Sequence, residues 1–207
     1  SFLLASTILY RTARWPTRNW YMPLLVIGLL LFFIPHLLRE TGLRDHVLGK
    51  LPSAAAYKGA FSLAAAIGIC LIVLGKSQAT FFTVWQPPFE WRVVSHFLML
   101  PGAILVTTGN LPPSHLAATT RNPMLLGVGL WGLAHLWSNG DLASILLFGC
   151  FAVWSMVKFV SMWEVAGRGS LAPDILWDAI AILLGLLLYA LVAMFHGHLF
   201  GVGLNFA

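Results

Sequence analysis

Six apolar stretches of 15 to 22 residues dominate this chain of 207 residues. A helix that crosses a bilayer needs about 20 apolar residues, within a range of roughly 17 to 25. Charged side chains make up only 9% of the sequence and hydrophobic ones 59%, whereas soluble domains carry about 25% charged residues. A water-soluble globule could not cover its surface with so few charges. The sequence therefore predicts an all-α, polytopic membrane helix bundle with about six transmembrane helices.

Charged or turn-forming residues bound most of the predicted spans. The spans cover residues 21–38, 54–75, 93–109, 123–137, 142–161 and 175–196. The fourth is only about 22 Å long by helix rise, so it sits off-centre or lets the bilayer thin beside it. Pro35 lies inside the first span and predicts a kink just before His36. Asp141 follows the turn between spans four and five, where its carboxylate can cap the fifth helix.

The basic residues give limited information on topology and partners. Residues 1–20 form an N-terminal arm with three arginines and no acid, which fits an organelle presequence remnant or an interfacial segment beside a domain of residues 21–207. Lysine and arginine divide about 5 to 7 between the two sides, too evenly to orient the chain. The net charge of +5 is dispersed, which predicts contact with the lipid bilayer, leaves other membrane subunits open as partners, and excludes nucleic acid.

Histidines are the main candidates for chemistry, because ionisable groups inside membrane helices are costly. Five lie within or at the edge of spans: His36, His96, His135, His196 and His198. The other two, His46 and His115, are expected to be solvated in loops. Neutral imidazoles on facing helices are common ligands of haem iron, although such histidines can also simply bond to carbonyls or reach the interface. His36 and His135 differ in depth by roughly 12 Å, so a ligand set that includes His96, His135 and the His196/His198 pair stays open.

The segment around His135 has several unusual features. Asn122 and Pro123 begin a helix. Gly127 and Gly129 lack side chains, so a second helix or a planar cofactor can approach this helix closely. Trp131 and His135 are four residues apart and share a face. This pattern suits a flat macrocycle, and it equally suits ordinary helix packing.

The remaining motifs and charges point away from several activities. The sequence contains no P-loop, no H-E-x-x-H, no C-x-x-C and no glycine-flanked serine elbow. We expect solvated loop carboxylates at Glu40, Asp45, Glu90 and Asp174, and helix-capping ones at Glu164 and Asp178. Proton pumping is poorly supported, because no series of acids crosses the membrane.

Residues 120–141 read TRNPMLLGVGLWGLAHLWSNGD. This run resembles the signature of the NnrU family of bacterial membrane proteins, T-R-H-P-x-L-x-G-x-x-L-W-x-x-A-H-L-x-x-N-G-D. The segments HLLR, AYKGAFSL, WQPP, MLPG and HGHLFGV are also similar to the family. The resemblance covers about residues 21–204 and implies a polytopic inner-membrane protein associated with nitrite and nitric oxide reduction.

A related branch, the 15-cis-zeta-carotene isomerases, shares these motifs and holds haem b. The resemblance implies haem b here too, with His36 and His135 as axial ligands. Candidate cofactor contacts from the same motif region are Gly127, Gly129, Trp131 and Arg121. Gly132 stands where the isomerase branch has a cysteine, so a thiolate-to-imidazole exchange is not available at that position. Asn122 replaces the usual motif histidine.

These observations define competing functions. The first is a haem-b protein linked to redox or nitrogen-oxide metabolism; the second is a non-catalytic accessory subunit of a larger membrane complex; the third is a carotenoid cis-trans isomerase. A methyltransferase is disfavoured, although the T-R-H-P element also resembles one in isoprenylcysteine methyltransferases, because the last span carries Asp178 as its only charge. A bacterial inner membrane is the expected location, with the mitochondrial inner membrane as the alternative.

Overall fold

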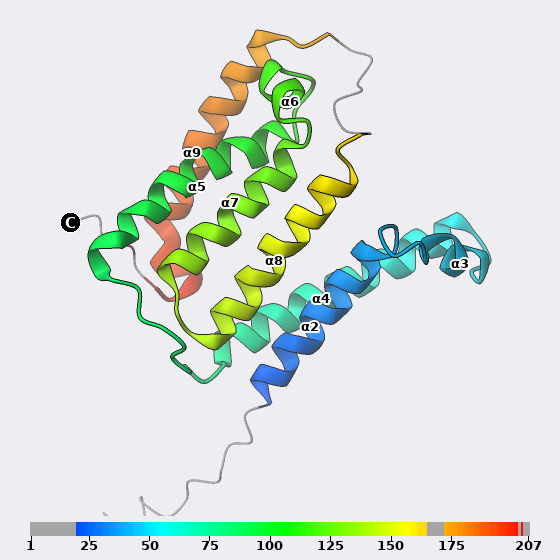
Figure 1. Cartoon of the computed structure of the whole chain (residues 1–207), viewed down its shortest axis with the longest axis horizontal. Coiled ribbons are helices and arrows are strands. Elements are labelled where there is room, and N and C mark those ends of the chain that lie inside the picture. Colours follow the sequence, from blue (N-terminus) through cyan, green and yellow to red (C-terminus); the bar gives the residue numbers. More distant parts are fainter. Residues whose placement is uncertain (1–19, 165–171, 203, 205–207) are drawn as a thin grey trace, which may run out of the picture.

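The computed structural model describes residues 20–164, 172–202 and 204, and this part of the chain is all-helical (Figure 1). A long helix occupies each of the six predicted segments: α2 (Tyr21–Leu37), α4 (Ala54–Gln78), α5 (Val93–Thr108), α7 (Pro123–Ser138), α8 (Leu142–Ser161) and α9 (Ile175–Phe200). Three short elements join them: α3 (Arg44–Gly49), the 3-10 helix η1 (Phe89–Arg92) and α6 (His115–Thr120). The predicted N-terminal arm lies outside the described residues, apart from Trp20.

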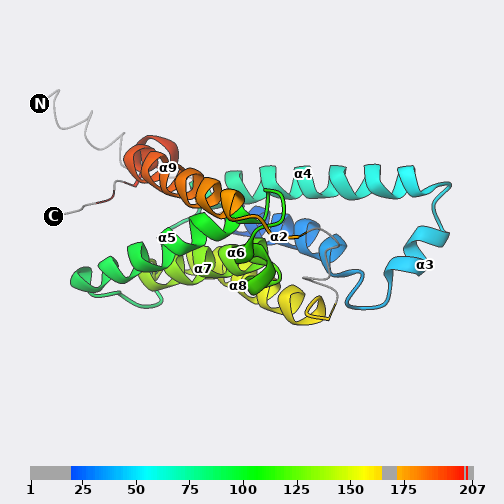
Figure 2. The ribbon, with the colours of Figure 1, turned by 90° about the horizontal axis from the view of Figure 1, so that it is seen from above.

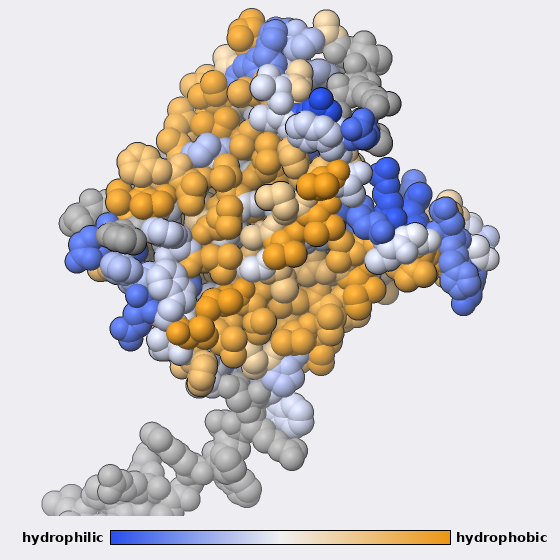
Figure 3. Space-filling model, in the orientation of Figure 1, coloured by the Kyte–Doolittle hydropathy of each residue, from blue (hydrophilic) through white to orange (hydrophobic). Residues whose placement is uncertain are grey.

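Three of these helices, α4, α8 and α9, are long and apolar enough to cross a membrane. Helices α2 and α5 are apolar but shorter, with 17 and 16 residues, and α7 also has 16. Figure 3 shows hydrophobic residues over the middle of the visible face and hydrophilic residues gathered towards the helix ends. The chain is therefore an integral membrane protein with an all-α fold, while the predicted number of about six spans is not confirmed.

The long helices pack in the order α4, α2, α8, α7, α5, α9. In Figures 1 and 2, α5, α7 and α8 form one layer, and α4 and α9 lie on the same side of it. Helices α2 and α8 are therefore neighbours although the sequence separates them by three other long helices. The buried core lies at this junction and consists of Leu25, Leu29, Phe33, Ile72, Ala143, Leu147 and Phe148.

Glycines allow several helix pairs to approach closely. A Cβ atom at Gly28 of α2 would lie 2.7 Å from the backbone of α4. One at Gly127 of α7 would lie 2.7 Å from the carbonyl oxygen of Gly102 on α5, and one at Gly185 of α9 would lie 2.5 Å from the Cα of Ile104. Apolar burial drives helix association weakly in lipid, so backbone proximity and dispersion contribute much of the packing energy. These three helix pairs are held by such contacts.

Asp141 caps α8, as predicted, by accepting a hydrogen bond from the Ser144 amide at 3.0 Å. The neighbouring Gly140 carbonyl accepts from the Val84 amide at 2.8 Å, which fixes the segment before η1 against this turn. The Lys76 ammonium lies 3.3 Å from the Asp141 carboxylate. Burial raises the pKa of Asp141, but the Ser144 hydrogen bonds and the Lys76 charge outweigh it and hold the pKa below its usual value.

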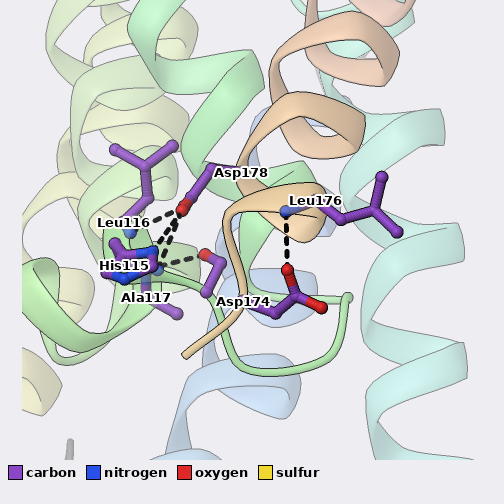
Figure 4. A network of polar contacts seen from close by, with 7 residues as sticks. His115, Leu116, Ala117, Asp174, Leu176 and Asp178 are labelled. Atoms are coloured by element: carbon purple, nitrogen blue, oxygen red, sulfur yellow. Dashed lines mark hydrogen bonds and ion pairs between the residues drawn. The ribbon is translucent and has the colours of Figure 1, made fainter. Parts of the chain in front are cut away.

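At the opposite end of the helix bundle, Asp178 connects α9 to α6, as Figure 4 shows. Its carboxylate accepts hydrogen bonds from the backbone amides of His115 and Leu116 at 3.0 and 2.8 Å, and so caps α6 instead of its own helix. Asp174 caps α9 through the Leu176 amide at 2.9 Å. The capping role predicted for Asp178 is thus confirmed. Asp174 and His115 are exposed, as expected, and the His115 ring also lies 2.9 Å from the Asp178 carboxylate.

Candidate functional site

Aromatic rings fill the space between α2, α8 and α7, with a histidine near each end. We call this group the aromatic cluster: Phe32, Phe33, His36, Phe61, Trp131, His135, Phe148, Phe151 and Trp154. Neighbouring ring centroids are 4.3 to 5.8 Å apart in these contacts and in the Phe33–Trp154 pair. The cluster brings together the two histidines and the tryptophan that the sequence singled out.

His36 lies at the end of α2, one residue after Pro35, which is inside the helix as predicted. Its ring stacks on Phe32 with centroids 4.3 Å apart and contacts the edge of Trp154 at 5.6 Å. The Nδ1 atom is 2.6 Å from the Phe32 carbonyl oxygen. A carbonyl can only accept, so this contact requires the proton on Nδ1 and leaves Nε2 with the lone pair of the neutral ring.

His135 has the same local arrangement on α7. Its Nδ1 atom is 2.8 Å from the Trp131 carbonyl oxygen, one turn earlier in the helix. The ring stacks on Phe148 at 4.4 Å and contacts the Trp131 ring at 5.1 Å. Nε2 again carries the free lone pair. Metal-binding histidines are commonly oriented by such a bond from the other ring nitrogen to a carbonyl, so the donor chemistry of both rings would suit metal binding.

The two histidines lie at different depths. His135 contacts α8 at Phe148 and His36 contacts it at Trp154, six residues or about 9 Å further along the helix. Between them Phe151 contacts Trp131 at 5.4 Å, and it contacts the Phe32 ring at the same distance. A single group bound by both imidazoles would therefore have to displace rings of the aromatic cluster.

The alternative set of histidines makes separate contacts. The Nδ1 atom of His96 is 2.8 Å from the Tyr189 hydroxyl, and that of His196 is 2.6 Å from the Val202 carbonyl. His198 lies near Phe195, with ring centroids 6.4 Å apart. Within the described part of the chain, no group of three or more histidine, cysteine, aspartate or glutamate side chains is placed to hold a metal ion.

The motif glycines serve helix contacts. Gly127 faces α5, where its Cβ position would also lie 2.7 Å from a Val106 methyl group. Gly129 faces α8, where a Cβ would lie 2.9 Å from the Ser155 hydroxyl oxygen. Gly132 faces the Phe148 carbonyl of α8 at 2.9 Å, so a larger side chain would not fit there without a shift. The contacts of Gly127 and Gly129 are those expected of helix packing, and Gly132 makes a contact of the same kind.

Arg121 lies at the exposed turn before α7. Its backbone φ of 60° is unusual for a residue with a side chain. The guanidinium donates to the Trp163 carbonyl at 3.0 Å and lies 4.1 Å above the Trp163 ring centroid. This arrangement caps the C-terminal end of α8 with a positive charge, and none of the contacts described for Arg121 reaches the aromatic cluster.

The sequence did not identify an ion pair next to His36. Lys158 of α8 donates to the Glu40 carboxylate at 2.8 Å, and Ser161 donates to the same oxygen at 3.1 Å. The Glu40 and Lys158 side chains are only 10% and 15% exposed. The solvated role predicted for Glu40 is therefore wrong. Burial raises the pKa of Glu40, but Lys158 and the other hydrogen bonds outweigh it and lower the pKa overall.

A signal for this ion pair was present. Lys158 lies inside a predicted span, where a charge needs a partner, and Trp154 is one helical turn before it. The partner was hidden because α2 and α8 are far apart in sequence. Phe33 meets Phe151, His36 meets Trp154 and Glu40 meets Lys158, each pair 118 residues apart. This constant offset shows that the two helices run in the same direction in register.

Comparison with known proteins extends over nearly the whole chain. The family model described as NnrU protein matches residues 24–204. No curated protein and no solved structure matches. The matched range includes both histidines of the aromatic cluster. It also includes all six long helices, except for the first turn of α2. The chain belongs to the NnrU family.

Proposed function

We propose that this NnrU family protein binds haem b at the aromatic cluster, with His36 and His135 as iron ligands, and acts in redox or nitrogen-oxide metabolism. One observation carries the proposal: two imidazoles, on different helices, both donate Nδ1–H to a carbonyl and border the same set of aromatic rings. Oriented neutral imidazoles and flat apolar contacts are what a buried porphyrin requires.

When bound, the iron would supply one-electron chemistry. The protein's part is to hold the imidazoles in one tautomer, to exclude water with the aromatic rings, and to provide flat surfaces at Trp131 and Phe148. Because the two histidines are about 9 Å apart along α8, binding also requires Phe151 to move. Arg121, Gly127 and Gly129 are assigned to helix packing and capping in this proposal, so they influence the site only through the positions of α7 and α8.

Absorption spectra of the detergent-purified protein, oxidised and dithionite-reduced, test this proposal, with a pyridine haemochrome assay for stoichiometry. We expect about one haem per chain, a Soret band at least tenfold weaker in His135→Gly and His36→Gly, and recovery on adding imidazole, since the free base can replace the missing ligand. His96→Gly serves as the matched control, because His96 contacts Tyr189 outside the aromatic cluster. An unchanged spectrum in His135→Gly would falsify the assignment.

A second candidate, an accessory subunit of a larger membrane complex, rests on the outer face of α8. Val153, Met156 and Val160 follow Gly149 at helical spacing and are 61 to 66% exposed, and, apart from the adjacent part of α8 itself, no described atom lies within 4 Å of the Cβ position at Gly149. Small-residue faces of this kind accept neighbouring helices. Recovery of a stoichiometric partner without pigment, lost in Gly149→Leu, would favour this function. The site gives no support to carotenoid isomerisation, since the helix contact at Gly132 leaves no room for a cysteine side chain.

A further inference from the structure

Two buried polar atoms beside His36 have no hydrogen-bonding partner among the described residues. They are Oε2 of Glu40 and Nε1 of Trp154. The Glu40 side chain is nine-tenths buried, and its other oxygen already accepts from Lys158 and Ser161. A buried polar atom without a partner costs roughly 1 to 3 kcal/mol, and more when it is charged. A polar group that bonded to both atoms would remove this cost at the α2–α8 interface.

The side chains that carry these two atoms make contacts on consecutive turns of the α2–α8 interface. Trp154 contacts His36, and Lys158, one turn later, contacts Glu40. One helical turn is about 5.4 Å, and a single oxygen that makes two hydrogen bonds can link atoms roughly 5 Å apart. Consecutive turns of one helix interface are therefore spaced at about the span that one bridging oxygen covers.

The chemistry of such a group follows from the two atoms. The indole N–H can only donate and the carboxylate oxygen can only accept, so the bridging atom has to accept from one and donate to the other. An anion would be repelled by the Glu40 carboxylate, and a cation would compete with Lys158 for a charge that is already paired. A neutral hydroxyl satisfies both atoms and adds no charge to the buried site.

We propose that Glu40 Oε2 and Trp154 Nε1 form a binding site for one hydroxyl group, which accepts from the indole and donates to the carboxylate. Its source is either an ordered water or the hydroxyl of a membrane-soluble ring compound, for which Phe61 beside His36 and Phe151 beside Trp154 offer flat apolar contacts. Neither Glu40 nor Trp154 is a proposed iron ligand, so the hydroxyl site can be tested in protein without haem, although Trp154 borders the proposed haem site. It would place an exchangeable proton one helical turn from His36.

Indole N–H spectra of protein labelled with 15N-tryptophan test the proposal, with Trp154→Phe assigning the Trp154 signal and removing only the donor. We expect an exchange cross-peak from the Trp154 N–H to water in plain buffer if the hydroxyl belongs to water. A saturable shift of the same signal on titration with hydroquinone instead identifies a ring hydroxyl. In either case Glu40→Gln should weaken the effect about tenfold, as expected for losing a hydrogen bond to a charged group.

Trp163→Phe is the matched control, since Trp163 lies beyond the end of α8 and contacts Arg121. The Trp154 signal should be unchanged in that variant. Because Glu40→Gln leaves Lys158 unpaired, the double variant Glu40→Gln with Lys158→Met retains a neutral interior if the single one does not fold. A Trp154 N–H that neither exchanges with water nor responds to hydroquinone overturns the proposal.

Discussion

Helix α5 touches α7 and α9 through glycines, whereas α2 and α8 meet through aromatic rings. At the glycine contacts the backbones themselves are in van der Waals reach, so no side chain can rearrange there. In the aromatic cluster the helices meet through rings that have rotamers available. We infer that the glycine contacts form the rigid part of the protein and that the aromatic cluster is the part able to admit a ligand.

Gly127→Leu should have the largest effect, because it places a side chain where α5 already lies. Its Cβ would be 2.7 Å from the Gly102 carbonyl, so the helices have to separate. We expect a loss of stability of about 3 kcal/mol or more, or a loss of folded protein. Thermal unfolding in detergent measures it. Gly149→Leu is the control, because no described atom outside the adjacent part of α8 lies within 4 Å of its Cβ position, and it should be nearly neutral; equal effects would refute the distinction.

Phe151→Leu should have a smaller effect, because the surrounding rings can adjust to the lost volume. We expect a loss of stability of about 1 to 2 kcal/mol. If the proposed haem site is right, the haem content per folded chain should stay the same or rise, since Phe151 lies between the two histidines. Phe97→Leu is the control, because Phe97 is 74% exposed on α5. A collapse as severe as that of Gly127→Leu would show that the aromatic cluster is equally rigid.

The smallest expected effect is a dependence of stability on pH at the polar end of the aromatic cluster. The pKa of Glu40 is lower in the folded protein than its ordinary value of 4.5. Its contribution to stability is therefore complete above about pH 4.5 and is lost as the pH falls through the folded value. We expect melting temperatures to decrease below that pH with a shallower slope in Glu40→Gln. Identical slopes in the two proteins would remove Glu40 as the cause.

The helices themselves could be predicted from the sequence because hydrophobicity and turn residues are local properties. The predicted segments agree with the helices at most ends, and Asp141 caps α8 as expected. Predictions for isolated polar residues were less successful. Glu40 was assigned to solvent, yet it is buried and bonded to Lys158 of a distant helix. His115 is exposed as expected, but it is also bonded to Asp178 of α9. Such partners depend on which helices become neighbours, and no local pattern contains that information.

The candidate site shows the same division. His36, His135 and Trp131 were recognisable because a histidine or a tryptophan at a fixed helical spacing inside an apolar run is unusual. Phe151 and Trp154 were not, since aromatic residues are ordinary in a membrane helix. Gly127 was ambiguous between a helix and a cofactor, and only the position of Gly102 on α5 assigned it to helix packing.

The sequence by itself determined that this chain is helical and membrane-embedded, because a backbone without water has to satisfy its hydrogen bonds within each segment. The tertiary structure alone decided that α2 and α8 lie side by side in register. This arrangement places His36 against Trp154 and Glu40 against Lys158, although the residues of each pair are 118 positions apart in the sequence. In a bilayer, apolar side chains gain little free energy by leaving lipid for another helix. The complementarity of rings, glycines and buried charges therefore selects which helices become neighbours.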